Sequence, residues 1–207
     1  MTSKNYIVIS QPNNQLAKEI AYTLNLPHGV CDKQVFADGE FTFIKLPELH
    51  PDQTVLYVAS QHVEMSNILE TTLLLREISD RSPHNLILLL PYLNSNRQDR
   101  RLDSGQSLMA KHVIDTLAAT GIQSVLLVDP HTDQSLEWFE SVGTSAQKVS
   151  CLPNMATEVV RAIKLPIVLV APDAGSKQVT ELCAKDLNLD YIVIDKKRDV
   201  SGEVLRE

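Results

Sequence analysis

Four short clusters of polar and charged residues carry side chains that suit phosphate groups and divalent cations. Arginine donates paired hydrogen bonds to phosphate oxygens, and lysine or arginine stabilises a phosphoryl group during its transfer. Carboxylate and imidazole groups hold Mg²⁺ directly or through water. The clusters are Asn-Arg-Gln-Asp-Arg-Arg at 96–101, Asp-Pro-His-Thr-Asp-Gln at 129–134, Pro-Asp-Ala-Gly-Ser-Lys at 172–177 and Asp-Lys-Lys-Arg at 195–198. Together they indicate chemistry on a small phosphate compound.

Each cluster also has an ordinary structural interpretation. The residues at 96–101 and 195–198 fit charged loops that are only solvated. Asp133 and Asp173 are each suited to cap the N-terminus of a helix, with Gly175 supplying the geometry of a turn. A single histidine in a turn, such as His131, is commonly a hydrogen-bonded surface residue. Taken alone, no cluster decides between the two interpretations.

The elements that position these clusters follow from a repeated pattern of apolar runs. The runs are continuous rather than alternating, which is typical of strands buried on both faces of a parallel sheet. Segments with helical periodicity lie between them. Strands are expected at 6–9, 55–59, 86–90, 125–128, 167–170 and 191–194, and helices at 15–26, 68–79, 108–120, 158–163 and 177–187. The sequence therefore predicts an α/β fold with a doubly wound, mostly parallel sheet and ligands at the carboxyl ends of its strands.

The chain is predicted to contain one α/β domain and the start of another. With 207 residues and 43% hydrophobic content it can bury at least one substantial core. A boundary is expected near 146–153, which gives domains at 1–150 and 151–207. The second unit has only two strand and two helix candidates, too few to close a core of its own. It is therefore expected to be incomplete, and either to pack on the first unit or to precede further chain.

Composition excludes several classes of protein. The formal net charge is −7 and no segment concentrates Lys or Arg, so no nucleic-acid partner is expected. The three cysteines lie far apart, which indicates neither a disulfide framework nor a zinc site. No apolar run suits a signal peptide or a membrane span, so we expect a cytoplasmic protein without a membrane partner. None of the seven glycines forms a P-loop or a dinucleotide fingerprint.

The four clusters belong to a larger ordered set of motifs. Its further members are Phe36-Ala37-Asp38-Gly39-Glu40, Pro91-Tyr92, Ala110-Lys111 and Phe139. In this order and spacing, over residues 6–198, the chain resembles the ribose-phosphate pyrophosphokinases, also called phosphoribosyl pyrophosphate synthetases. That resemblance implies two phosphoribosyltransferase-like units in tandem, with an ATP site shared between them and a neighbouring subunit.

The resemblance also implies roles for individual residues. Mg²⁺ is the expected cofactor and ATP a substrate. Because the family's ATP site is shared with a neighbouring subunit, the chain is expected to self-associate as a dimer or a hexamer. By position, the adenine ligands from the neighbour are Phe36, Asp38, Gly39 and Glu40; the ATP contacts are Arg97 and Gln98; the Mg²⁺ ligands are His131 and Asp173; the catalytic cations are Lys196 and Arg198. The implied reaction transfers the diphosphoryl group of ATP to the 1-hydroxyl of ribose 5-phosphate and leaves AMP.

Several positions depart from the family pattern. The loop that cradles the 5-phosphate in the family is expected beyond Glu207, so we expect nucleotide binding without turnover by these residues alone. Val142-Gly143-Thr144 replaces the usual Pro-x-Asp, and the stretch at 102–106 reads Leu-Asp-Ser-Gly-Gln. Ser176 stands where the second glycine of Asp-x-Gly-Gly is usual.

Three hypotheses follow. The first is that these residues are part of an active pyrophosphokinase. The second is a non-catalytic, nucleotide-binding relative that acts as a regulatory or associated subunit of a full-length synthetase. The third is an unrelated phosphate-binding α/β domain.

Overall fold

The computed structural model describes residues 5–60, 64–81, 83–163 and 165–194, and the backbone of 196–198 and 204–206. The chain divides into two units, Met1–Val149 and Ser150–Glu207.

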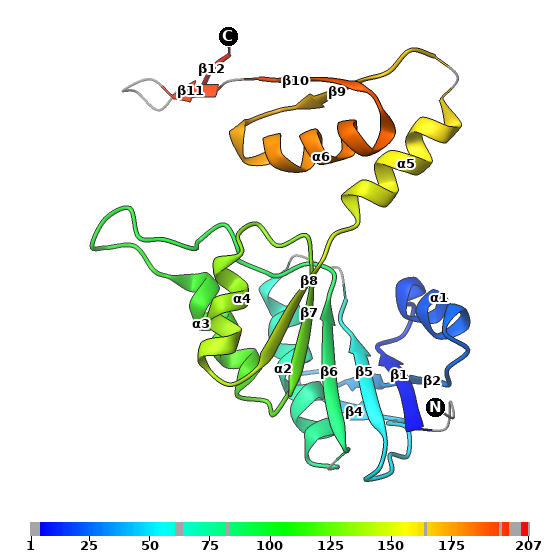
Figure 1. The fold of residues 1–207 in the computed structure, drawn as a ribbon. Coiled ribbons are helices and arrows are strands. Elements are labelled where there is room, and N and C mark those ends of the chain that lie inside the picture. Colours follow the sequence, from blue (N-terminus) through cyan, green and yellow to red (C-terminus); the bar gives the residue numbers. More distant parts are fainter. Residues whose placement is uncertain are drawn as a thin grey trace. The chain divides into compact units, whose positions relative to one another are not determined.

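A six-stranded parallel sheet forms the centre of the first unit (Figure 1). Its strand order is β2-β1-β5-β6-β7-β8, and every neighbouring pair is parallel. The strands are β1 (Tyr6–Ser10), β2 (His28–Val30), β5 (Thr54–Val58), β6 (Asn85–Leu90), β7 (Ser124–Val128) and β8 (Ser145–Val149). This confirms the predicted α/β class with its mostly parallel sheet.

Helices cover both faces of this sheet because its central strands are apolar on both sides. Leu74 of α2 and Ile114 of α3 pack in the larger core with Val55 and Leu88. On the other face, Ala17 of α1 packs in a smaller cluster. Figure 1 shows α1 on one side of the sheet and the other three helices opposite it. The helices are α1 (Gln15–Thr23), α2 (Met65–Ser79), α3 (Met109–Ala118) and α4 (Gln134–Ser141).

The direction of winding reverses at β1. From β1 the chain passes through α1 to β2 on one side, whereas β5 pairs on the other side of β1 and β6, β7 and β8 continue outward from it. In open α/β sheets the crevice at such a reversal is the usual place for a ligand, beyond the carboxyl ends of the strands. The fold therefore marks the ends of β1 and β5 as a candidate site.

A β-hairpin forms a separate two-stranded sheet in the first unit. Strand β3 (Asp32–Val35) pairs antiparallel with β4 (Phe41–Ile44). Phe43 packs against the larger core, and Phe41 lies edge-on to Phe43 with ring centroids 5.5 Å apart. The hairpin is thus held to the unit by side chains rather than by the hydrogen bonds of the main sheet.

The second unit contains a short parallel sheet and two helices. Strand β9 (Val168–Ala171) pairs with β10 (Asp190–Val193), and Cys183 and Ala184 of the second helix are buried. The remaining elements are α5 (Leu152–Ala162), the 3₁₀ turn η2 (Ala174–Ser176), α6 (Lys177–Leu187), and the antiparallel pair β11 (Lys196–Arg198) and β12 (Val204–Arg206). Among the described residues of either unit, no helix is long and apolar enough to cross a membrane.

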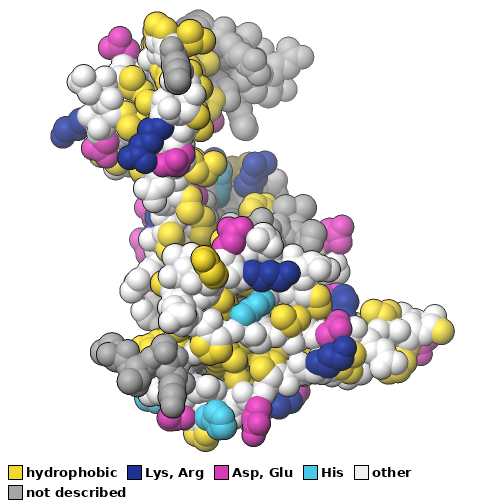
Figure 2. All heavy atoms as spheres, turned by 90° about the vertical axis from the view of Figure 1, so that its right-hand side faces the viewer, with side chains coloured by type: hydrophobic (Ala, Val, Ile, Leu, Met, Phe, Trp, Pro, Cys, Tyr) yellow, Lys and Arg dark blue, Asp and Glu magenta, His cyan; other side chains and the backbone are white. Residues whose placement is uncertain are grey.

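The surface carries both signs of charge. On the face that Figure 2 draws, Lys and Arg side chains are scattered among Asp and Glu, and they form no continuous basic patch. This distribution agrees with the absence of a Lys/Arg-rich segment in the sequence.

Candidate functional site

The first group of predicted site residues lies beyond the neighbouring strands β6 and β7. These strands are parallel partners, with Leu90 opposite Leu127, so their carboxyl ends meet at one edge of the sheet. Arg97 and Gln98 follow β6, and His131 follows β7. All three side chains are exposed. The fold therefore brings the predicted ATP contacts and one predicted metal ligand to the same edge.

A buried hydrogen bond ties the loop after β6 to helix α4. Ser135 Oγ donates to Asn96 Oδ1 at 2.6 Å, and the two residues are 0% and 5% exposed. The next residue, Arg97, is therefore held near the N-terminus of α4. Gln98 N donates to Ser95 O at 2.8 Å, which closes a turn around Arg97. A positive φ of 60° at Ser95 begins this turn.

Hydrogen bonds of Asp129 and Asp133 fix the turn after β7 on either side of His131. Asp129 has a φ of 39°, and its backbone N–H donates to Val149 O at 3.0 Å. Asp133 begins α4, but its carboxylate accepts a hydrogen bond from Lys148 Nζ at 2.9 Å and makes no side-chain cap. Asp133 therefore occupies the N-cap position of α4 without a capping hydrogen bond from its side chain.

The predicted adenine residues form the tip of the β3–β4 hairpin. Phe36 N donates to Glu40 O at 2.7 Å, and Gly39 N donates to Phe36 O at 3.0 Å. Asp38 Oδ1 accepts from Glu40 N at 3.1 Å. Gly39 has a φ of 91°, a conformation that side chains rarely adopt. This network fixes the tip while Phe36 remains 46% exposed.

Asp173 lies in the second unit and caps the η2 turn. Its Oδ1 accepts hydrogen bonds from Ser176 N and Ser176 Oγ, both at 3.1 Å. The Ser176 hydroxyl thus completes a capping box, so the departure from glycine at this position has a structural consequence. The helix-cap alternative for Asp173 is observed.

The remaining predicted site residues are the two catalytic cations and the pair of metal ligands. Lys196 and Arg198 lie in strand β11, and their side chains fall outside the described residues. His131 belongs to the first unit and Asp173 to the second, and their convergence on one cation stays a prediction. In the described part of the chain, no three side chains of His, Cys, Asp or Glu gather as a metal site. A cation at either residue would need water or substrate oxygens as further ligands.

A cavity in the first unit was not predicted from the sequence. It measures about 640 Å³ and lies at the reversal point of the sheet, beyond β1 and β5. Four segments line it: the β1–α1 loop, the hairpin, the end of β5 and the start of α2. The lining includes Gln11, Asp32, Lys33, Phe43, Asn67 and Glu70.

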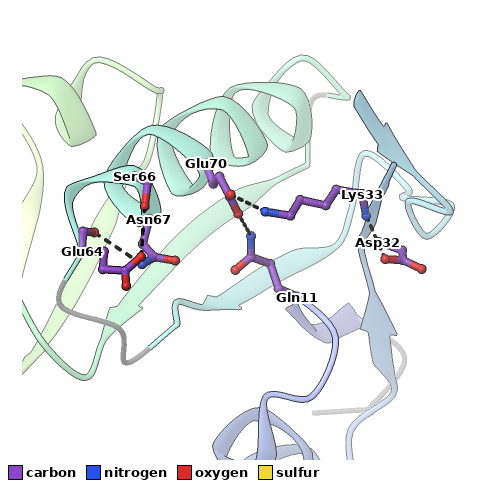
Figure 3. Close-up of polar contacts among 7 residues, drawn as sticks. All are labelled: Gln11, Asp32, Lys33, Glu64, Ser66, Asn67 and Glu70. Atoms are coloured by element: carbon purple, nitrogen blue, oxygen red, sulfur yellow. Dashed lines mark hydrogen bonds and ion pairs between the residues drawn. The ribbon is translucent and has the colours of Figure 1, made fainter. Parts of the chain in front are cut away.

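Glu70 is the polar centre of this cavity (Figure 3). Its Oε2 accepts a hydrogen bond from Gln11 Nε2 at 2.9 Å, and its Oε1 forms an ion pair with Lys33 Nζ. The Lys33 ammonium also lies 5.6 Å from the centroid of the Phe41 ring. Three distant segments of the chain supply this network. A scan of the sequence for short motifs misses it because no local spacing links these residues.

Cys31 lies at the cavity wall and is 1% exposed. Burial raises the pKa of its thiol to about 12, from an ordinary value of 9.0, although Arg81 opposes the shift. The group is therefore a neutral thiol at physiological pH and no nucleophile. Burial likewise raises the pKa of the neighbouring Tyr57 hydroxyl.

The parallel sheet with helices on both faces defines an α/β protein of the doubly wound class. A family model of the N-terminal domain of ribose phosphate pyrophosphokinase matches residues 6–121. The chain belongs to this family of enzymes, and the hypothesis of an unrelated phosphate-binding domain is therefore wrong.

Individual relatives agree with this assignment. The chain is 29% identical over 200 residues to the ribose-phosphate pyrophosphokinase of Sulfurisphaera tokodaii, which covers 96% of this chain and 67% of that protein. It is 30% identical over 198 residues to the enzyme of the same name from Clostridium perfringens, covering 95% and 62%. The fold resembles the phosphoribosylpyrophosphate synthetase from Mycobacterium smegmatis with a TM-score of 0.78, at 22% identity, over 98% of this chain and 67% of that one.

Proposed function

We propose that the chain contributes the nucleotide- and metal-binding part of a ribose-phosphate pyrophosphokinase. The reaction is Mg²⁺-dependent transfer of the diphosphoryl group of ATP to ribose 5-phosphate, which gives phosphoribosyl diphosphate and AMP. The observation that carries this proposal is the family match over residues 6–121, which contains the hairpin tip at 36–40 together with Arg97 and Gln98. The chain spans about two thirds of its relatives, so the reaction is proposed for the protein to which these residues belong.

The hairpin tip is the proposed adenine-binding segment. Its internal hydrogen bonds, from Phe36 N to Glu40 O and from Glu40 N to Asp38, hold the backbone rigid without using the aromatic ring. An exposed, pre-positioned ring is suited to stack on a base at low entropic cost. Because the tip is exposed in its own chain, it is available to complete the site of a neighbouring subunit. We therefore include self-association, as a dimer or hexamer, in the proposal.

Arg97 and Gln98 are the proposed contacts to the ATP phosphates. The guanidinium of Arg97 is exposed at the carboxyl edge of the sheet, and its backbone is anchored through the neighbouring Asn96. An anchored arginine loses less freedom when it binds, and its planar fork matches two phosphate oxygens. Positioning of this kind contributes much of the rate enhancement in phosphoryl transfer.

His131 and Asp173 are the proposed Mg²⁺ ligands. An exposed imidazole and a half-buried carboxylate are donors that Mg²⁺ accepts directly or through water, while phosphate oxygens complete its shell. When bound, the cation neutralises charge on the transferring phosphates. The chain itself supplies Lys196 and Arg198 as further cations at that charge. The 1-hydroxyl oxygen of ribose 5-phosphate forms the new bond to the β-phosphorus, the bond to the α,β-bridging oxygen breaks, and AMP leaves.

A second candidate is a nucleotide-binding subunit without catalysis of its own. The observation that favours it is the capping box, because two hydrogen bonds from Ser176 engage the Asp173 carboxylate oxygen that a cation needs. The two candidates differ in one measurement. Mixing the chain with a full-length synthetase changes that enzyme's rate or regulation if the chain is an associated subunit.

The cysteines and the charge distribution support the proposed location and the proposed class of partner. A cytoplasmic location is supported by the three cysteines, which are all free thiols, as a reducing compartment allows. The scattered charges of Figure 2 and the net charge of −7 support small phosphate compounds, rather than nucleic acid, as the partners.

The decisive experiment measures Mg-ATP binding by calorimetry, with the Phe36→Ala variant against a matched control. Removing a stacked aromatic ring is expected to weaken ATP binding by about tenfold. Tyr22 on α1 is an exposed aromatic residue outside the proposed site, at 88% exposure, so Tyr22→Ala should bind like the unchanged protein. Equal affinity of the Phe36→Ala variant and the unchanged protein would remove the adenine assignment.

A further inference from the structure

The cavity at the reversal point lies apart from every residue assigned above. None of the proposed adenine, phosphate or metal ligands lines it. At about 640 Å³ it falls within the range of small-molecule sites, and its place beyond β1 and β5 is where doubly wound sheets bind ligands. The side chains of Gln11, Lys33 and Glu70 converge on it from three elements of the chain (Figure 3).

The hydrogen bonds of the lining leave it rich in acceptors. A carboxylate can only accept, so the contact with Glu70 orients the Gln11 amide with its NH₂ group toward Glu70. The Gln11 amide oxygen remains, and it accepts no side-chain hydrogen bond from the described residues. Asn67 is oriented in the same way, because its Nδ2 donates to Glu64 O at 3.4 Å. Each oxygen of Glu70 also retains a second lone pair beyond its contact with Gln11 or Lys33.

The charge and the apolar lining narrow the class of ligand. The Lys33 ammonium is paired with Glu70, whereas the Asp32 carboxylate accepts from the Lys33 backbone N–H and lies 4.0 Å from Lys45 Nζ. The Lys33 ammonium is therefore already engaged by a carboxylate, and this disfavours a phosphate as the ligand. Phe43 and Val35 contribute an apolar wall from the hairpin. Acceptor oxygens beside an aromatic wall suit a molecule with several hydroxyl donors and a C–H face.

We propose that this cavity binds an uncharged, hydroxyl-rich small molecule, of the size of a pentose or a nucleoside. Its hydroxyls donate to Glu70, to the Gln11 amide oxygen and to Asn67, and its ring lies against Phe43. The cavity and its polar lining belong to the first unit alone. The inference therefore stands or fails independently of the proposed transferase function.

The test uses amide NMR of the ¹⁵N-labelled chain with D-ribose as the probe. The side-chain NH₂ groups of Gln11 and Asn67 report directly on the cavity. We expect saturable shifts of these two signals at millimolar ribose. D-Ribose 5-phosphate adds a bulky, charged phosphoryl group, and it should bind more weakly because the Lys33 ammonium is already paired with Glu70. Tighter binding of the phosphate, or no saturable shift with ribose in the high millimolar range, overturns the proposal.

A pair of variants separates the cavity from the rest of the helix. Glu70→Gln keeps the shape of the side chain but removes the charged acceptor, which should raise the dissociation constant for ribose about tenfold. Glu77→Gln is the matched control, because Glu77 also lies on α2 but pairs with Arg81 outside the cavity. Thermal unfolding of both variants confirms that they are folded. Unchanged ribose binding in Glu70→Gln overturns the assignment of Glu70.

Discussion

Ser135 and Asn96 form a hydrogen bond between two buried side chains that lie in different parts of the chain. The Ser135 hydroxyl on α4 donates to the Asn96 amide oxygen at 2.6 Å. Asn96 precedes Arg97, and Ser135 follows the turn that holds His131. This one contact therefore sets the position of a proposed phosphate ligand relative to a proposed metal ligand.

Ser135→Ala should lower the free energy of unfolding by about 1–3 kcal/mol, because it leaves a buried acceptor without its donor. Ser141→Ala on the same helix is the control. Ser141 is exposed, its hydroxyl donates to Trp138 O, and its loss should change stability by no more than about 0.5 kcal/mol. Urea unfolding measures both variants. Similar values for the two would show that the buried contact contributes little.

Two glycines provide a matched test of the adenine-binding tip. Gly39 and Gly143 have φ values of 91° and 85°, and a Cβ atom at either would meet nothing within 4 Å. Alanine at each position should therefore cost a similar amount of stability, about 1–3 kcal/mol, through backbone strain alone. Only Gly39→Ala should also weaken ATP binding, since it distorts the proposed site. An equal loss of ATP affinity in both variants would point to general destabilisation instead.

Asp173→Asn tests the proposed metal ligand. The amide oxygen of asparagine can still accept from Ser176, so the cap and the fold should persist while one negative charge is lost. We expect Mg²⁺-dependent nucleotide binding to weaken by about tenfold or more, as measured by calorimetry with and without Mg²⁺. His112→Ala, on the exposed surface of α3, should leave binding unchanged. Retention of full Mg²⁺ dependence in Asp173→Asn would remove this ligand.

Cys31 makes the stability of the first unit depend on pH in the alkaline range. In the folded chain the pKa of its thiol is about 12, against an ordinary value of 9.0. The unfolded chain therefore releases this proton first, so its stabilising contribution is complete below pH 9 and is lost as the pH rises toward 12. The slope approaches about 1.4 kcal/mol per pH unit at most.

Chemical unfolding between pH 8 and pH 11 measures this effect, with Cys31→Ala as the comparison. The variant should lose stability less steeply with pH than the unchanged protein, whatever its absolute stability. Parallel curves for the two proteins would contradict the assignment.

Sequence patterns predicted most of the central fold because its strands are nearly uniform apolar runs. The run at 86–90, for example, became β6 (Asn85–Leu90). Strand β8 was not predicted, since Ser-Ala-Gln-Lys-Val at the edge of the sheet has only one large apolar residue. Helix α5 begins at Leu152, before the predicted start at 158, because Pro153 occupies its first turn, where proline is favourable.

The candidate site was predictable only where its residues are close in sequence. The tip at 36–40 and the turn after β7 are local motifs. The hairpin around that tip was not predicted, because its strand β3 reads Asp-Lys-Gln-Val and is exposed at three of its four positions. The network of Gln11, Lys33 and Glu70 joins residues that only the tertiary fold brings together.

The position of β1 between β2 and β5 has a consequence for the order of folding. Strands β5, β6 and β7 each pair with the next strand along the chain, so they close shorter loops than β1 and can associate early. Strand β1 finds its partner β5 only after α1, β2 and the whole hairpin have been passed, which costs more loop-closure entropy. We expect docking of β1 to limit the folding rate, and the cavity beyond β1 and β5 to be among the last features to form.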